Sequence, residues 1–261
     1  MKLSCCIGTN RDRLDVMKKI GFKYCEVALS SLVNLSDEDF AALKAKLIET
    51  GISPVSANGM FPGEINLLLG KEGYKAVEEY LDKAFPRAKE LGIPVIILGS
   101  GNSRRIPEGM TLEEAEDLFC AVCRDVISPK CAEYGLMIGI EELNKNEVNF
   151  INSCKDAMKL IRRMNLPNIK LLVDFFHSIQ EGDTVEELRE FGKEGYIVHC
   201  HYGSPINERR APKKGVDEHL VKEYMEMLKS VGYEGAFSIE GKITDFEAEL
   251  TEAFEIMSAY N

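Results

Sequence analysis

The stretch Leu171-Leu172-Val173-Asp174-Phe175-Phe176-His177 changes from wholly apolar to ionisable within a few residues. Ile169–Val173 is a short, mostly apolar run, which is typical of a strand buried on both faces of a parallel sheet. Asp174 then follows at the C-terminal end of this strand, and His177 comes three residues later. In an eight-stranded βα barrel, active sites lie at the C-terminal ends of the strands. Asp174 is equally suited to cap a following helix. The residues at the other strand ends are therefore needed to distinguish an active-site residue from a helix cap.

The rest of the chain repeats the same strand-then-helix pattern on both sides of this stretch. The expected strands are Leu3–Ile7, Tyr24–Ala28, Pro54–Ala57, Val95–Leu98, Met137–Glu141, Ile169–Val173, Ile197–His201 and Gly235–Ile239. The expected helices are Asp12–Ile20, Ser36–Thr50, Tyr74–Leu91, Thr111–Gly135 with a bend or break at Pro129, Ser153–Met164, Thr184–Phe191, Asp217–Val231 and Phe246–Ser258.

This alternation decides the fold class. Eight short strands and eight helices in 261 residues predict an α/β protein with a single (β/α)8 TIM barrel, residues 1–261 forming one domain. The alternative is a doubly wound open sheet. That fold normally carries a glycine-rich phosphate-binding turn after its first strand, and Cys6-Ile7-Gly8-Thr9-Asn10 is not one.

Composition limits which classes of binding partner and which cellular compartment we expect. The net charge of -11 repels polyphosphate, so we expect no nucleic-acid partner. No apolar run approaches the roughly 20 residues that span a bilayer, and the first residues lack a signal-peptide core, so we expect no membrane partner and a cytoplasmic location. Eight cysteines in a chain of this size favour free thiols over disulfides. The sequence leaves the oligomeric state open, and a homo-oligomer is compatible with it.

Four residues of types that bind metals lie at the ends of consecutive expected strands. Glu141, Asp174, His201 and Glu240 end the fifth to eighth strands, which the barrel would bring together. Three carboxylates and one imidazole suit one hard or borderline divalent ion with open water positions. The prediction is therefore Mn²⁺ or Mg²⁺, with Co²⁺ or Zn²⁺ as substitutes.

Several motifs carry a resemblance to a known family. They are Ile140-Glu141-Glu142-Leu143-Asn144, Val173-Asp174-Phe175-Phe176-His177, His199-Cys200-His201 followed by Arg209-Arg210-Ala211-Pro212, and Gly232-Tyr233-Glu234-Gly235-Ala236-Phe237-Ser238-Ile239-Glu240. Together they resemble the sugar phosphate isomerase/epimerase superfamily, the xylose isomerase-like TIM barrels. The resemblance spans essentially the whole chain and is specific for fold and metal site. It is not specific for substrate, because ketose 3-epimerases, hydroxypyruvate isomerases, inosose dehydratases and apurinic-site endonucleases share the scaffold.

The resemblance also implies roles for individual residues. It makes Glu141, Asp174, His201 and Glu240 the metal ligands, with Glu141 and Glu240 doubling as the catalytic acid/base pair.

Matching the ketose 3-epimerases position by position implies three sugar-binding residues: Glu147, His177 and Arg209. The spacing from His201 to Arg209 is eight residues, longer than the six expected in the closest epimerases, which leaves Arg210 as the alternative.

The chemistry of such a site leads to a function. Removing a proton next to a carbonyl creates an enediolate whose charge a divalent ion can stabilise, and two carboxylates can exchange the proton between faces. The predicted function is a divalent-metal-dependent epimerase or isomerase of a sugar, sugar phosphate or small polyol-type ketose. The alternative is a dehydratase of the inosose or dehydroshikimate type. A nuclease is disfavoured by the acidic charge and by only four histidines, and a non-catalytic sugar-binding barrel by the complete ligand set.

Four further residues near the expected site have open roles. His199 is expected to line the barrel below His201, and Glu26, at the end of the second strand, either reaches the site or forms an ordinary ion pair. Arg104 and Arg105, in the turn after the fourth strand, either hold a phosphate or face solvent, and solvent is favoured.

Overall fold

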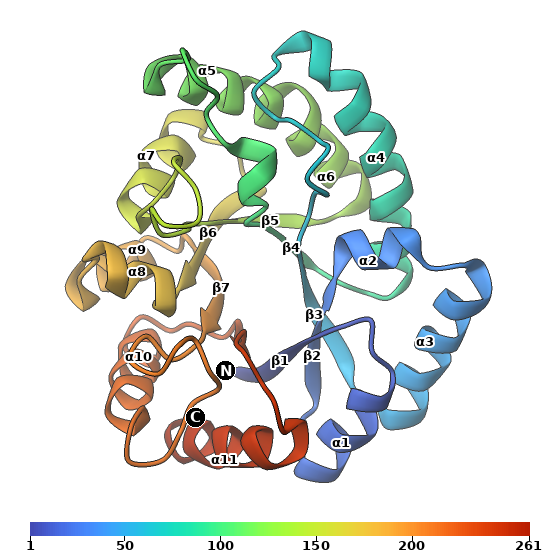
Figure 1. Ribbon diagram of the computed structural model, residues 1–261, viewed down its shortest axis with the longest axis vertical. Helices are drawn as coiled ribbons and strands as arrows, with labels where there is room; N and C mark the ends of the chain where they lie inside the picture. The colour runs from blue at the N-terminus through green and yellow to red at the C-terminus, as the bar shows by residue number, and fades with distance from the viewer.

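The computed structural model describes residues 1–261 as a closed barrel of eight parallel strands with helices packed around it (Figure 1). The strands are β1 (Lys2–Gly8), β2 (Tyr24–Ala28), β3 (Ser53–Asn58), β4 (Val95–Leu98), β5 (Met137–Glu141), β6 (Ile169–Asp174), β7 (Ile197–Tyr202) and β8 (Ala236–Ile239). Each strand pairs with the next in sequence, and β8 pairs with β1 to close the ring. The predicted single (β/α)8 barrel is confirmed.

The connections between strands contain more helices than the sequence pattern indicates. They are α1 (Asp12–Ile20), α2 (Leu29–Asn34), α3 (Asp37–Thr50), α4 (Lys71–Glu90), α5 (Leu112–Val122), α6 (Ser128–Tyr134), α7 (Cys154–Met164), α8 (Phe175–Glu181), α9 (Val185–Lys193), α10 (Glu218–Ser230) and α11 (Phe246–Tyr260), with short turns η1 (Gly101–Arg104) and η2 (Cys123–Ile127). The unpredicted α2 and α8 follow directly on β2 and β6. At six and seven residues they are too short to show a helical repeat of apolar positions.

The long helix expected between Thr111 and Gly135 is three pieces. It opens with a capping box at Thr111 and Glu114, as its sequence indicates. The π-helical turn η2 then interrupts it, and Pro129 occupies the first turn of α6, where its missing N–H costs nothing. The interruption thus lies at Cys123–Ile127, directly before Pro129, and not at the proline itself.

The third strand carries a proline without losing its place in the barrel. Pro54 pairs with Cys25 of β2, and the register between β2 and β3 shifts directly after that pair. Because proline has no N–H to donate, an irregularity of the ladder is expected beside it. The shift places Glu26 opposite Ser56, which matters for the site described below.

Apolar side chains form one large core, in which Val173, Ile140 and Ile239 are fully buried on three strands. Alternate strand positions carry buried polar residues, among them Ser4, Glu26, Ser56, His199 and Ser238. Both chain ends meet, because the amino group of Met1 donates to Asn261 Oδ1 at 2.9 Å (Figure 1). None of the helices combines the length and the hydropathy that crossing a membrane requires.

Candidate active site

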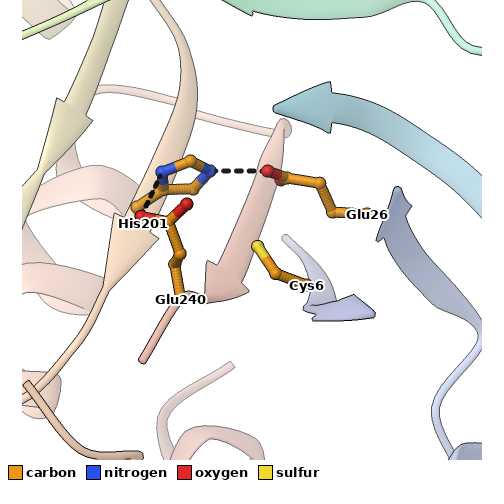
Figure 2. A group of neighbouring side chains, drawn as sticks. All are labelled: Cys6, Glu26, His201 and Glu240. Atoms are coloured by element: carbon orange, nitrogen blue, oxygen red, sulfur yellow. Dashed lines mark hydrogen bonds and ion pairs between the residues drawn. The ribbon is translucent and has the colours of Figure 1, made fainter. Parts of the chain in front are cut away.

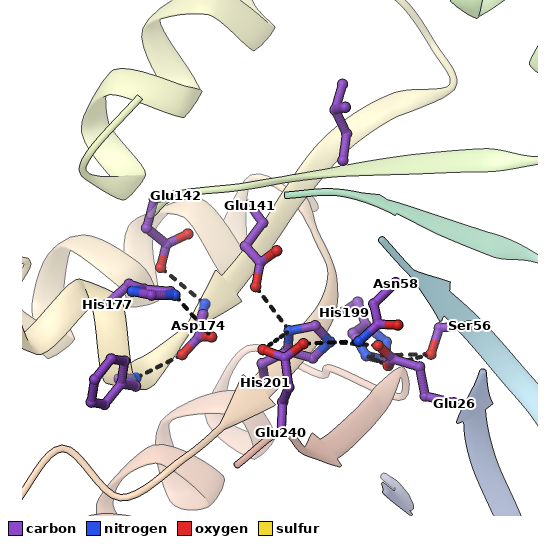
Figure 3. Close-up of polar contacts among 12 residues, drawn as sticks. Glu26, Ser56, Asn58, Glu141, Glu142, Asp174, His177, His199, His201 and Glu240 are labelled. Carbon is purple, nitrogen blue, oxygen red and sulfur yellow. Dashed lines mark hydrogen bonds and ion pairs between the residues drawn. The ribbon is translucent and has the colours of Figure 1, made fainter. Parts of the chain in front are cut away.

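Four ligand-type side chains converge at the C-terminal mouth of the barrel (Figure 3). Glu141 ends β5, Asp174 ends β6, His201 lies near the end of β7, and Glu240 follows β8. One donor atom from each lies within 4.8 Å of the donors of the other three. The structure therefore brings together the four residues that the strand-end pattern selected.

Asp174 caps helix α8 with one carboxylate oxygen and faces the site with the other. Its Oδ1 accepts the Phe176 N–H at 2.8 Å, which caps α8, while Oδ2 faces the other site residues. Its own N–H donates to Glu142 Oε1 at 2.9 Å. The two readings of this residue are thus compatible, because a carboxylate has two oxygens.

His201 stands between carboxylates on both sides of its ring. Nδ1 lies 3.0 Å from Glu141 Oε1 and 3.4 Å from Glu240 Oε2, and Nε2 lies 2.8 Å from Glu26 Oε1. Burial alone would lower the pKa of His201, but Glu26 and Glu240 outweigh it and raise the pKa well above its usual value. The raised pKa favours the imidazolium form, which donates from both ring nitrogens to these carboxylates.

The remaining carboxylates of the quartet are crowded and buried. Burial raises the pKa of Glu141, and the nearby charge of Glu240 adds to that rise. Burial also raises the pKa of Asp174, against the opposing effect of Arg209. Carboxylates whose charges are disfavoured in this way fit a divalent cation, which would compensate them.

Arg209 is the arginine that reaches the site. Its Nη2 donates to Glu240 Oε2 at 2.6 Å and to Asp174 Oδ2 at 3.2 Å, and its Nη1 to Glu147 Oε1 at 3.3 Å. Arg210 instead points away and pairs with Glu249 at 2.8 Å.

The backbone that presents Arg209 is strained. Glu208 and Arg209 have φ values of 53° and 57°, a left-handed conformation that costs a non-glycine residue about 1 kcal/mol or more. Neighbouring glycines make room for the turn: a Cβ on Gly241 would lie 2.6 Å from the Arg209 carbonyl oxygen. Such strain indicates that the surrounding loop holds the guanidinium in place.

His177 and Glu147, the other expected sugar-binding residues, lie at the edge of the same cluster. His177 Nε2 is 3.6 Å from Asp174 Oδ2, and its Nδ1 accepts the Asn144 N–H at 3.2 Å. The side chain of Glu147 is 42% exposed, so it faces the mouth of the barrel. The structure thus groups all three expected sugar-binding residues above the quartet, and their roles remain a prediction.

The two arginines after β4 have different environments. Arg105 is exposed, as expected, and donates to the Glu147 carbonyl. Arg104 is not: the expectation that it faces solvent is wrong, because its side chain is fully buried. Its guanidinium donates to the backbone carbonyls of Glu141 at 2.6 Å and Leu98 at 3.4 Å, and burial lowers its pKa to about 10.

Sequence reasoning missed Gly99, which follows β4. A Cβ there would lie 1.7 Å from Glu141 Oε2 and 2.9 Å from Glu141 Cδ. The sequence shows only a run of small residues from Gly99 to Gly101. Such a run indicates a place where little side-chain volume fits, but not which neighbouring side chain fills that place.

Comparison with known proteins identifies the family to which the chain belongs. The model of the xylose isomerase-like TIM barrel family matches residues 14–260. The chain belongs to this family. A 3-dehydro-D-guloside 4-epimerase of Escherichia coli is 27% identical over 240 residues, covering 89% of this chain and 87% of the relative. A D-psicose 3-epimerase of Enterocloster bolteae is 24% identical, covering 87% and 75%.

A solved structure shares the fold. The crystal structure of the IOLI protein with a zinc atom superposes with a TM-score of 0.76 at 18% identity, covering 100% of this chain and 99% of that one. The named epimerases among the relatives support an isomerase-class enzyme.

Proposed function

We propose that this protein is a divalent-metal-dependent epimerase or isomerase of a small sugar or ketose. The observation that carries the proposal is the convergence of Glu141, Asp174, His201 and Glu240 within 4.8 Å at the mouth of the barrel. Sugar epimerases among its relatives favour this reaction over the dehydratase alternative.

The donor set fits a hard or borderline divalent ion. Three carboxylates and one imidazole are ligands that Mn²⁺ and Mg²⁺ accept, and Glu141, Asp174, His201 and Glu240 would hold the ion. When bound, the ion supplies a Lewis acid that polarises the substrate carbonyl and stabilises the negative charge that develops on it.

Two glutamates of the quartet are suited to move the proton. His201 and Arg209 outweigh burial and lower the pKa of Glu240, whereas burial raises the pKa of Glu141. As ligands of a divalent ion both would be carboxylates, and each could take a proton from the substrate or return one to it. Because they come from β5 and β8, the two can act on different faces of one sugar.

The cations around the site favour a substrate without a phosphate group. Arg104 is buried against backbone carbonyls, and Arg105 is exposed and donates to the Glu147 carbonyl. Arg209 already pairs with three carboxylates, and Arg210 with Glu249. Three of these arginines are thus held by carboxylates or by buried carbonyls, which leaves no buried arginine free to pair with a phosphate.

The test is turnover in heavy water. The protein with added Mn²⁺ is incubated with ketoses, ketose phosphates and inososes, and the products are analysed by NMR and mass spectrometry. A carboxylate that has taken a carbon-bound proton can exchange it with solvent, so we expect one deuterium at the inverted or isomerised carbon. A product without solvent deuterium would indicate hydride transfer, and a product short of one water would indicate the dehydratase.

A further inference from the structure

We infer that Glu26 is a positioning residue of the metal site, which holds the ring of His201 so that Nδ1 faces the ion. The inference rests on the proposed function only through the metal-binding quartet. Neither strand-end spacing nor the comparisons assign a role to this glutamate.

Glu26 is a fully buried carboxylate with both oxygens engaged. Oε1 lies 2.8 Å from His201 Nε2, and Oε2 lies 2.6 Å from His199 Nε2. Ser56 Oγ also donates to Oε2 at 2.6 Å. A buried carboxylate with this many close partners is held in one orientation, and Figure 3 shows it on the opposite side of His201 from Glu141 and Asp174.

The contact determines which nitrogen of His201 is free to bind the ion. An ionised carboxylate only accepts hydrogen bonds, so Nε2 carries the proton that it receives. Nδ1 is then the nitrogen that faces Glu141 and Glu240. Metal-binding histidines usually donate their other N–H to a carboxylate in this way, and removing the partner typically weakens metal binding about 10- to 100-fold.

The competing assignment makes Glu26 a ligand itself. Cys6, Glu26, His201 and Glu240 also offer donor atoms within 4.8 Å of one another (Figure 2). That set would use Nε2 of His201 and a thiolate. We favour the outer role because both oxygens of Glu26 are engaged, by two histidines and a serine, whereas Glu141 of the quartet is hydrogen-bonded only through Oε1, to Nδ1 of His201.

The first experiment needs no variant. The Mg²⁺-loaded protein, labelled with ¹⁵N-histidine, has only four histidines to assign. We expect His201 to keep its proton on Nε2 and to lose the one on Nδ1. The opposite pattern would overturn the inference even if every variant failed to fold.

The second experiment measures Mn²⁺ affinity by the EPR signal of free Mn²⁺. Glu26→Gln should weaken binding about 10- to 100-fold with an unchanged far-UV CD spectrum. The matched control is Glu116→Gln, because Glu116 is also a buried, paired carboxylate, bonded to Lys159 at 2.6 Å away from the site. It should bind Mn²⁺ within about twofold of the wild type. Equal affinity in Glu26→Gln and wild type would contradict the positioning role.

Cobalt distinguishes the competing ligand set. A Co²⁺-loaded protein that shows a thiolate-to-cobalt absorption band, lost in Cys6→Ser, would make Glu26 a member of the inner set and overturn the inference. Because these measurements use metal and no sugar, they can succeed even if no tested sugar turns over. In that case the proposed reaction fails and the role of Glu26 stands.

Discussion

At the scale of single residues, burial decides protonation states that composition cannot show. His177 is fully buried, and this burial lowers its pKa from 6.5 to about 4. The folded protein therefore keeps His177 neutral at a pH where the unfolded chain takes up a proton. Between about pH 6.5 and 4 the unfolded state binds more protons, so His177 contributes a loss of stability as the pH falls.

This predicts a measurable pH slope. Replacing His177 by Gln should make the free energy of unfolding less dependent on pH between 6.5 and 4, by up to about 1.4 kcal/mol per pH unit. Urea unfolding of the chelator-treated protein at several pH values measures it. His219→Gln is the control, because His219 is exposed on α10. Parallel slopes for His177→Gln and the wild type would contradict the assignment.

The two proposed proton-transfer residues can be tested separately from metal loss. Glu141→Gln and Glu240→Gln keep the side-chain shape but remove the base, so each should lower turnover about 10²-fold or more. Mn²⁺ must be present in excess of the measured Kd of each variant, so that weaker binding is not read as lost chemistry. Near-normal turnover in either variant would rule out a mechanism that uses both carboxylates.

At the scale of elements, β4 is shaped to leave room for a neighbour. Gly99 directly follows this strand, and the Glu141 carboxylate occupies the space where a side chain would otherwise lie. Glu141 is itself 5% exposed, so it has little room to move away.

Gly99→Ala should therefore have the same kind of effect on metal binding and turnover as a substitution of Glu141. We expect a folded protein by circular dichroism, weaker Mn²⁺ binding, and turnover reduced about 10²-fold, because the added methyl group displaces a proposed ligand and proton-transfer residue. Gly63→Ala is the control, since its Cβ would meet Asn102 at an ordinary 3.7 Å. If Gly99→Ala matched the wild type in both measurements, the packing of Glu141 would not matter for its role.

At the scale of the whole molecule, closure of the barrel concentrates negative charge. The site gathers Glu26, Glu141, Asp174 and Glu240 in a protein whose net charge is already -11. A divalent ion that binds only the folded protein should offset this repulsion and stabilise the fold.

Thermal unfolding with and without Mn²⁺ checks this expectation. At a free Mn²⁺ concentration 100 times the Kd, the wild type should gain about 2.7 kcal/mol and a higher Tm. Asp174→Ala and His201→Ala should fold but show no such shift, because each removes one of the four proposed ligands. A full Tm shift in both variants would show that the ion binds elsewhere.

The sequence by itself determined the barrel and the four converging residues. Short apolar runs, glycine stops and capping residues are local signals, so they placed the strands within a few residues. The rule that parallel strands present their C-terminal ends on one face then grouped Glu141, Asp174, His201 and Glu240 without any knowledge of packing.

Only the tertiary structure decided the contacts made across the barrel and between loops. Glu26 and His201 are 175 residues apart, and their contact depends on the register of β2 and β3. The choice of Arg209 over Arg210 depends on a left-handed backbone that residue types there do not indicate. Arg104 is buried because backbone carbonyls of two strands meet at its guanidinium. Such contacts follow from how elements pack in three dimensions, which local sequence patterns do not encode.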